Sequence, residues 1–92
     1  MFVEILYFAE IKDITGKEKE KFDAVKNLED LLSMLFKKYE ILRNLIWDEK
    51  TQEIHNFISV IINNQAIRKK DPSLVPLNDG DTVAFLSPVS GG

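Results

Sequence analysis

One segment of this chain has the periodicity of a full amphipathic helix, and it lies between segments that alternate with period two. Leucines and Tyr39 recur at three- and four-residue spacing over residues 28–39, which places them on one stripe of a helix. Asn27 is a good N-cap, and Glu29 and Asp30 put negative charge where the helix dipole favours it. Because a chain of 92 residues can build only one modest core, the flanking strands must share this stripe.

The segment Phe2–Ala9 alternates around a single charge, Glu4, which is typical of a strand with one wet face. The residues expected to point toward the core are Val3, Ile5 and Tyr7. The following stretch, Ile11–Lys17, ends in the turn signal Thr15-Gly16-Lys17. A second strand is expected over Glu18–Phe22.

The segment Glu40–Asn56 leaves two interpretations open. Its apolar residues could extend a helix, whereas Asp48–Glu53 has the composition of an exposed turn. A strand is expected over Phe57–Asn63, with Ser59 on the solvent side. The residues expected to point inward are Ile58, Val60 and Ile62. Asn63-Asn64 favours a tight hairpin, because asparagine tolerates a positive φ.

Two short strands complete the pattern. One begins at Ala66-Ile67, and the other covers Thr82–Leu86 after the turn Asn78-Asp79-Gly80-Asp81. The order strand, strand, helix, strand, short strand, strand predicts an α+β roll, in which a mixed sheet packs on one main helix as in the β-grasp. Composition does not exclude a ferredoxin-like fold, which needs a second helix, and Glu40–Asn56 leaves that choice open.

Composition excludes several classes of function. Twelve basic and 15 acidic residues give a formal net charge of −3, so no basic stripe is available for a nucleic acid. The chain has no cysteine, which excludes disulfides, thiolate metal sites and thiol catalysis. No apolar run approaches the roughly 18 residues of a membrane span, and Glu4 and Glu10 interrupt any signal peptide. We expect a cytoplasmic protein with no nucleic-acid or membrane partner.

Few side chains offer chemistry of their own. His55 is the only histidine, and the spacing indicates no carboxylate beside it, which favours a surface or structural role. The acidic pairs Glu18/Glu20 and Asp79/Asp81 could in principle serve acid–base catalysis, but their strand and turn settings favour a solvated surface. No resident metal or cofactor is predicted for this chain.

Apolar residues are also expected on the side of the sheet away from the helix. They are Leu6, Phe8, Ile61, Ala84 and Leu86, which we call the outer patch. A contiguous apolar patch on a small domain indicates a binding surface. Two alternatives stay open: Glu40–Asn56 folds back over the patch, or the assigned facing is off by one residue.

The chain ends in Gly91-Gly92, two of its four glycines. At average glycine usage, such a terminal pair arises by chance about once in 200 chains. The preceding Ser87-Pro88-Val89-Ser90 should be extended, because proline disfavours helix at its own position and at the one before it. Two residues without Cβ atoms can thread a narrow channel and place a carboxylate in another protein's active site. We therefore predict a domain over 1–86 and an extended arm over 87–92, the alternative being a frayed end.

Three stretches carry a resemblance to a known family. They are LYFAEIKDITG at Leu6–Gly16, the amphipathic helix, and LNDGDTVAFLSPVSGG at Leu77–Gly92. Together they resemble the MoaD/ThiS group of ubiquitin-like sulfur carriers, and in particular MoaD, the small subunit of molybdopterin synthase. The resemblance covers nearly the whole chain and implies the β-grasp fold, in agreement with the order of elements.

The resemblance implies a cycle centred on Gly92. An E1-like, MoeB-like enzyme would use ATP to adenylate its carboxylate, and a sulfur donor would convert the acyl-adenylate to a thiocarboxylate. The arm would then insert into the MoaE-like large subunit and donate its sulfur to cyclic pyranopterin monophosphate, in molybdenum cofactor biosynthesis. The chain would bind no cofactor itself, would be a monomer alone, and would form a heterotetramer with the large subunit.

The resemblance also implies roles for single residues. Gly92 would bear the sulfur, with the channel neighbours Gly91, Ser90, Val89 and Pro88 forming the arm. Phe8 and Leu86 lie where the family has apolar contacts to partners. The sequence departs from the family pattern at Ser87, where many MoaD proteins have a second proline.

A second departure is the long Tyr39–Phe57 segment, which contains Trp47 and is similar to MoaD-like proteins of archaea. Some of those proteins are also attached to lysines as modifiers. Three alternatives to the molybdopterin pathway therefore stay open. They are a protein modifier joined through Gly92 to lysines, a carrier for thiazole or tungsten-pterin synthesis, and an interaction domain whose tail is inert.

Overall fold

The computed structural model describes residues 2–68 and 71–87. In chain order, the elements are β1 (Phe2–Leu6), α1 (Ala9–Thr15), β2 (Lys19–Asp23), α2 (Leu28–Lys38), α3 (Glu40–Ile46), β3 (Trp47–Asp48), β4 (Glu53–Ile54), β5 (Ser59–Ile62), β6 (Gln65–Ile67), the 3-10 helix η1 (Pro72–Leu74) and β7 (Thr82–Leu86). None of the helices in the described part of the chain is long and apolar enough to cross a membrane.

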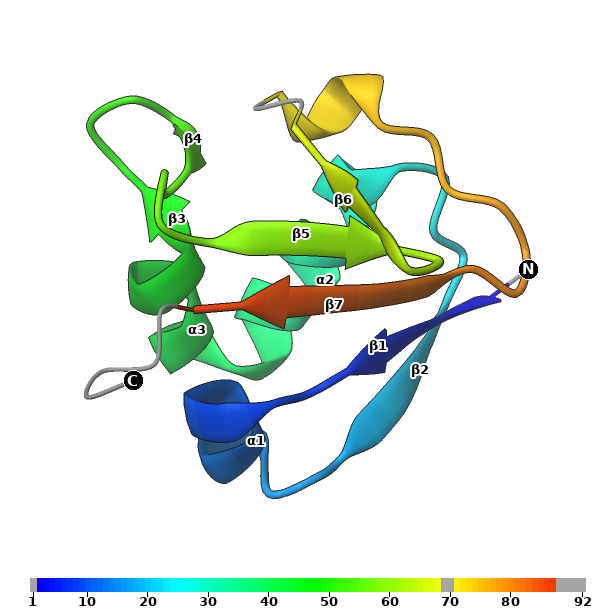
Figure 1. Ribbon diagram of the computed structural model, residues 1–92, viewed down its shortest axis with the longest axis horizontal. Helices are drawn as coiled ribbons and strands as arrows, with labels where there is room; N and C mark the ends of the chain where they lie inside the picture. Colours follow the sequence, from blue (N-terminus) through cyan, green and yellow to red (C-terminus); the bar gives the residue numbers. More distant parts are fainter. Residues whose placement is uncertain (1, 69–70, 88–92) are drawn as a thin grey trace.

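Five strands form one mixed sheet in the order β2-β1-β7-β5-β6. β1 runs parallel to β7, and the other pairs are antiparallel. Figure 1 shows this sheet in front of α2 and α3, which lie together behind it. The first and last strands are thus neighbours in the sheet, with β2 beyond β1 on one side and the β5–β6 hairpin beyond β7 on the other. This arrangement confirms the predicted α+β β-grasp roll and excludes the ferredoxin-like alternative.

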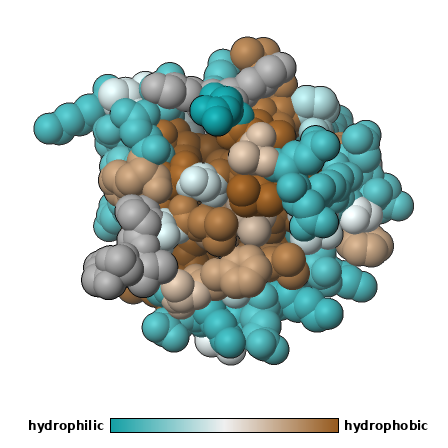
Figure 2. Space-filling view, viewed as in Figure 1, coloured by the Kyte–Doolittle hydropathy of each residue, from teal (hydrophilic) through white to brown (hydrophobic). Residues whose placement is uncertain are grey.

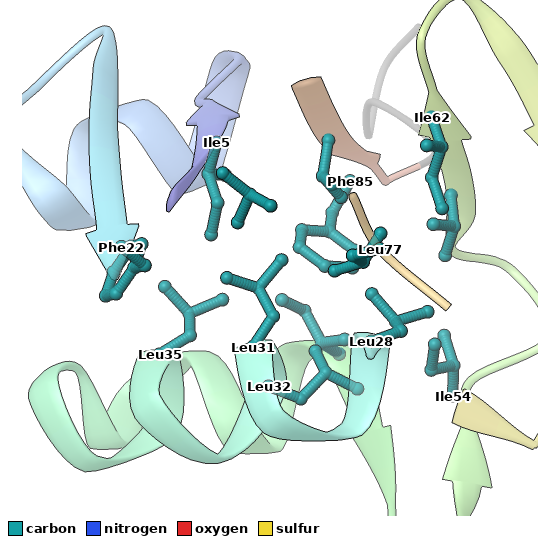
Figure 3. Packing of buried hydrophobic residues seen from close by; sticks show 14 of the residues in the cluster. Ile5, Phe22, Leu28, Leu31, Leu32, Leu35, Ile54, Ile62, Leu77 and Phe85 are labelled. Atoms are coloured by element: carbon teal, nitrogen blue, oxygen red, sulfur yellow. The ribbon is translucent and has the colours of Figure 1, made fainter. Parts of the chain in front are cut away.

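The inner face of the sheet, which faces α2, carries the core. All the inward positions expected from alternation are buried, namely Val3, Ile5, Tyr7, Ile58, Val60 and Ile62. In β7, Val83 and Phe85 are buried on the same face. The four leucines of the α2 stripe are buried against them. In Figure 3, Leu28 and Leu31 of α2 point toward Phe85 of β7. The alternation of the strands and the period of the helix therefore predict the same core.

The start of α2 is capped as the sequence predicts. The side chain of Asn27 accepts a hydrogen bond from the backbone N–H of Asp30 at 2.8 Å, which satisfies one of the free N–H groups of the first turn. The backbone N–H of Leu28 donates to the carbonyl of Val75 at 2.9 Å, so the helix start is also tied to the loop before β7.

The first strand is shorter than expected, and a helix follows it. β1 ends at Leu6 rather than Ala9, and α1 occupies most of the stretch expected to lead into a turn. Only Ile11 of α1 is buried, so this short helix has too few apolar positions to show a helical period. Gly16 ends it with a φ of 72°, a left-handed conformation that glycine adopts without strain.

The ambiguous segment contains a helix and a small hairpin. α3 buries Leu42 and Ile46 and packs against α2, on the inner side of the sheet. β3 and β4 then pair as a two-stranded ribbon, and half-buried Trp47 packs at the edge of the core. Residues 40–56 therefore enlarge the inner side and do not fold back over the outer patch.

The hairpin between β5 and β6 has the expected turn. Asn63 and Asn64 have φ values of 50° and 69°, the left-handed conformation that asparagine tolerates. The strand itself is shorter than the expected Phe57–Asn63, because only Ser59–Ile62 pairs with its neighbours.

Candidate functional site

The strand register aligns part of the outer patch in one row across the sheet. Leu6 of β1 is paired with Ala84 of β7, and Ala84 is paired with Ile61 of β5. Ile61 is in turn paired with Ala66 of β6, which extends the apolar row by one strand. Figure 2 shows a continuous hydrophobic area across the middle of this face, over β1, β7 and β5.

The two remaining members of the patch lie toward one end of the sheet. Leu86 is the last residue of β7 and is 38% exposed, and Phe8 follows β1 and is 47% exposed. Because β1 and β7 run parallel, both residues lie at the end where β7 finishes. The facing predicted from alternation is therefore correct. That the five residues contact a partner stays a prediction.

The next row of the same face is polar, since it consists of Lys21, Glu4 and Thr82 across β2, β1 and β7. Beyond it, at the opposite end of β1, Phe2 is 38% exposed. Leu86 and Phe8 lie at the end where Ser87, the last residue that the structure describes, continues the chain. The predicted arm residues Pro88, Val89, Ser90, Gly91 and Gly92 lie outside the described residues.

Glu20 differs from the sequence prediction of a solvated acidic pair. Its side chain is only 9% exposed and lies on the inner face, since it is paired with buried Ile5. Its oxygens accept hydrogen bonds from Tyr7 Oη at 2.8 Å and Tyr39 Oη at 2.9 Å. The Nζ atoms of Lys17 and Lys38 also donate hydrogen bonds to the Glu20 carboxylate. The alternation that buries Phe22 two residues later already indicates this facing.

These contacts shift the pKa values of Glu20 and Tyr7. Burial alone would raise the pKa of Glu20, but the hydrogen bonds from the two lysines and two tyrosines outweigh it and lower the pKa to about 2. Burial first, and then the hydrogen bond to Glu20, raise the pKa of Tyr7 far above its ordinary range. With four donors on its carboxylate, Glu20 joins β2 to the end of α2 and is unsuited to proton transfer.

His55 also has a structural position. Its Nε2 lies 3.2 Å from the carbonyl oxygen of Asn44, and its ring stacks on Phe57 with centroids 4.7 Å apart. Its Nδ1 is 3.8 Å from Asp48 Oδ2, so the prediction of no neighbouring carboxylate is wrong. The β3–β4 hairpin brings these two residues together, and their spacing of seven shows no regular period from which to predict it.

The remaining acidic pair shapes the turn before β7. Asp79 Oδ1 accepts from the backbone N–H of Phe2 at 2.8 Å. Asp81 accepts from the backbone N–H of Asn78 at 2.7 Å and from the amide of Asn63 at 2.9 Å. Among the residues that the structure describes, no three histidine or acidic side chains gather in a way that could hold a metal ion.

Two curated relatives match this chain along its length. The molybdopterin synthase sulfur carrier subunit of Chlamydomonas reinhardtii is 29% identical and covers 100% of both chains. The protein of the same name from Homo sapiens is 31% identical over 98% of this chain and 93% of its own.

Solved structures show the same fold. SAMP1 from Haloferax volcanii has a TM-score of 0.82 at 23% identity and covers 100% of both chains. The small archaeal modifier protein 1 (SAMP1) from Methanosarcina acetivorans has a TM-score of 0.80 at 29% identity, over 99% of this chain and 96% of its own. Subunit 1 of the molybdopterin-converting factor from Helicobacter pylori was solved in complex with subunit 2. The match to that structure has a TM-score of 0.65 at 26% identity and covers 100% of both chains.

A family model also matches almost all of the sequence. The model of the ThiS family matches residues 5–92, which include the end of β1, the main helix, β7 and the Gly-Gly ending. The relatives' names and the β-grasp sheet agree with this match. The chain therefore belongs to the ThiS family of ubiquitin-like sulfur carriers.

Proposed function

We propose that this chain is the cytoplasmic sulfur carrier and small subunit of a molybdopterin synthase. The observation that carries the proposal is the position of the outer patch, which crosses the middle of the sheet and includes Leu86, where β7 finishes. A partner docked on this patch would receive residues 87–92 directly from the end of the strand. The names of the two curated relatives support the choice of pathway.

The chemistry requires activation of the Gly92 carboxylate, because a free carboxylate is a poor electrophile. An E1-like enzyme joins the carboxylate oxygen to the α-phosphorus of ATP and releases pyrophosphate. A sulfur donor then attacks the acyl carbon, AMP leaves, and a thiocarboxylate remains. In the large subunit this sulfur passes to cyclic pyranopterin monophosphate, and two such transfers build the dithiolene of molybdopterin.

The small subunit supplies the sulfur atom and the large subunit supplies the active-site side chains. Glu20 and His55 are engaged in contacts that hold the fold, which supports this division of roles. The structure of the Helicobacter pylori subunit 1 with subunit 2 supports a large-subunit partner for this chain. We propose a heterotetramer of two small and two large subunits.

Deletion of Gly92 tests the proposal. The truncated chain, its large subunit and the activating enzyme would be combined with ATP, a sulfur donor and cyclic pyranopterin monophosphate. We expect no thiocarboxylate by intact mass, no molybdopterin, and an unchanged melting temperature, because the core lies within residues 3–85. Ser90→Ala, which keeps the Gly-Gly ending, is the control and should stay active. Conversion by the truncated chain would contradict the proposal.

A second candidate function is a protein modifier joined through Gly92 to lysines. The likeness to the small archaeal modifier protein 1 of Methanosarcina acetivorans favours it. Mass spectrometry of the tagged protein from its own cells separates the two functions. An oxygen-to-sulfur mass increase on Gly92 supports the carrier, and isopeptide linkage of Gly92 to lysines of many proteins supports the modifier.

A further inference from the structure

The sheet has two edge strands, and they differ in charge. β2 forms one edge with the sequence KEKFD, in which four of the five residues are charged. Charged side chains on an edge strand oppose its pairing with another chain. β6 forms the other edge with the sequence QAI, which carries no charge. By this criterion, β6 is the edge that can accept a further strand.

β6 also borders an open groove. Among the strands in the described part of the chain, β6 pairs with β5 alone, so one side of its backbone faces no strand. A groove of about 550 Å³ lies between β6 and the segment that contains η1, which Figure 1 shows beyond the sheet edge. Its apolar wall includes Ile67, Val75 and Leu74, and Leu74 is 60% exposed. An extended segment can therefore lie along β6 with an apolar side chain in this groove.

A cation lies at the end of the same strand. Arg68 directly follows β6 and lines both this groove and a second groove of about 300 Å³, whose described lining includes no carboxylate. The carboxylate in the first groove is that of Asp81, which accepts hydrogen bonds from Asn78 and Asn63. Within residues 2–68 and 71–87, Arg68 forms no ion pair. An acidic group of a partner can therefore pair with Arg68.

We propose that β6 accepts an extended acidic segment of a partner protein as a further strand of the sheet. Backbone hydrogen bonds to β6 would hold the segment, as in other complexes in which a peptide adds a strand to a sheet edge. Because side chains alternate along a strand, one set would enter the groove beside Leu74 and the other would face the opposite side. A carboxylate of the segment would pair with Arg68, since complementary charges across an interface favour the correct partner.

A second copy of this chain fits the same edge less well. Its own β6 is three residues long and uncharged, and it is followed by another Arg68. Two copies paired edge to edge would thus bring two arginines and no carboxylate to the paired strands, and like charges there are unfavourable. Charge complementarity favours a partner that carries carboxylates. The inference does not rest on the proposed function, because it concerns the edge of the sheet and not the surface where β7 ends.

A peptide titration followed by NMR tests the inference. The probe is an acetylated and amidated hexapeptide of alternating glutamate and valine, added at low ionic strength to the isotope-labelled full chain. We expect the backbone amide signals of Gln65–Ile67 and Leu74 to shift on binding, and those of Lys19–Asp23 at the other edge to stay unchanged. The matching peptide of alternating lysine and valine should bind about fivefold more weakly or worse, because it places cations beside Arg68.

Arg68→Glu should reverse the preference between the two peptides. It should weaken binding of the glutamate peptide by about fivefold and strengthen binding of the lysine peptide, and both changes should shrink at high salt. Lys37→Glu reverses an exposed lysine on α2 that lines neither groove, and this matched control should leave both affinities within about twofold of wild type. Leu74→Asp should weaken the glutamate peptide as well, because it puts a like charge into the apolar wall of the groove.

Three results would overturn the inference. The first is a glutamate peptide that shifts no signal of β6 at millimolar concentration. The second is equal binding of the two peptides, with Arg68→Glu changing neither affinity. The third is a shift of the β6 signals when the chain is concentrated without peptide and no reversal when the glutamate peptide is added, since the occupant would then be a second copy. Each of these results would leave the proposed function standing, because none involves sulfur transfer.

Discussion

The two faces of the sheet are built from the same strands but have different surroundings. Phe85 and Leu86 are adjacent in β7, and Phe85 is 1% exposed whereas Leu86 is 38% exposed. The inner face is covered by α2 and by α3, which packs on α2. The outer face carries apolar residues with no element over them among the described residues. Alternate positions of one strand can thus be selected for different purposes, one for folding and one for binding.

The largest expected effect is the difference in stability between a substitution on the inner face and one on the outer face. Phe85→Ala should lower the free energy of unfolding by about 3–5 kcal/mol, because it opens a cavity in the core. Leu86→Ala should lower it by about 1 kcal/mol or less, since its side chain is already partly in water. Urea unfolding followed by circular dichroism measures both. Equal losses would mean that the outer face also holds the fold together.

For affinity to the large subunit, we expect the outer-face substitution to have the large effect. Leu86→Asp should cost about 2 kcal/mol or more of affinity for the large subunit, because it puts a charge into an apolar contact. Its stability should remain close to wild type. Met34→Asp is a matched control, since Met34 is 37% exposed on α2, away from the outer patch. Calorimetry measures the affinity of both variants for the large subunit. An equal loss of affinity for both would argue against the patch as the docking surface.

A third prediction concerns the charged residue on the inner face. Glu20→Gln should lower the free energy of unfolding by about 1–3 kcal/mol, because the charged hydrogen bonds that join β2 to α2 are weakened. Glu18→Gln, at a side chain that is 83% exposed, should change it little.

The same residue makes stability depend on pH. Folding lowers the pKa of Glu20 from its ordinary 4.5 to about 2, so its contribution is present above about pH 4.5. It is lost as the pH falls toward 2, where the folded state also takes up the proton. Unfolding curves between pH 6 and 2 should therefore fall more steeply for wild type than for Glu20→Gln. Parallel curves would show that other carboxylates dominate.

The smallest expected effect is at the start of the helix that covers the inner face. Asn27→Ala removes the acceptor for the Asp30 N–H and should cost about 1 kcal/mol. Asn27→Asp keeps an acceptor and should be nearly neutral. Thermal melts of both variants test whether this cap holds α2 on the sheet, and equal melting temperatures would show that packing alone does so.

The part of the fold that depends on periodicity was predictable, and the part that depends on long-range contacts was not. Alternation in β1, β5 and β7 predicts both faces, because each strand has enough residues to show period two. α1 was missed because a helix of seven residues with one buried side chain has no visible period. The contact between His55 and Asp48 was missed because a hairpin of irregular spacing creates it.

The candidate site likewise has one part that follows from the sequence pattern and one part that stays untested. Its sheet residues follow from alternation and are placed by the register. The predicted arm rests on residue types and on resemblance, and it stays a prediction.

The position of β7 between two antiparallel strand pairs has a consequence for folding. Without β7, the sheet would separate into the β1–β2 pair and the β5–β6 pair, and isolated two-stranded ribbons are marginal in water. The pairing of β1 with β7 also closes a loop that spans most of the chain, which makes folding slower than local contacts alone would. Partly folded states therefore lack the complete row from Leu6 to Ile61, and only the cooperatively folded domain presents the whole outer patch.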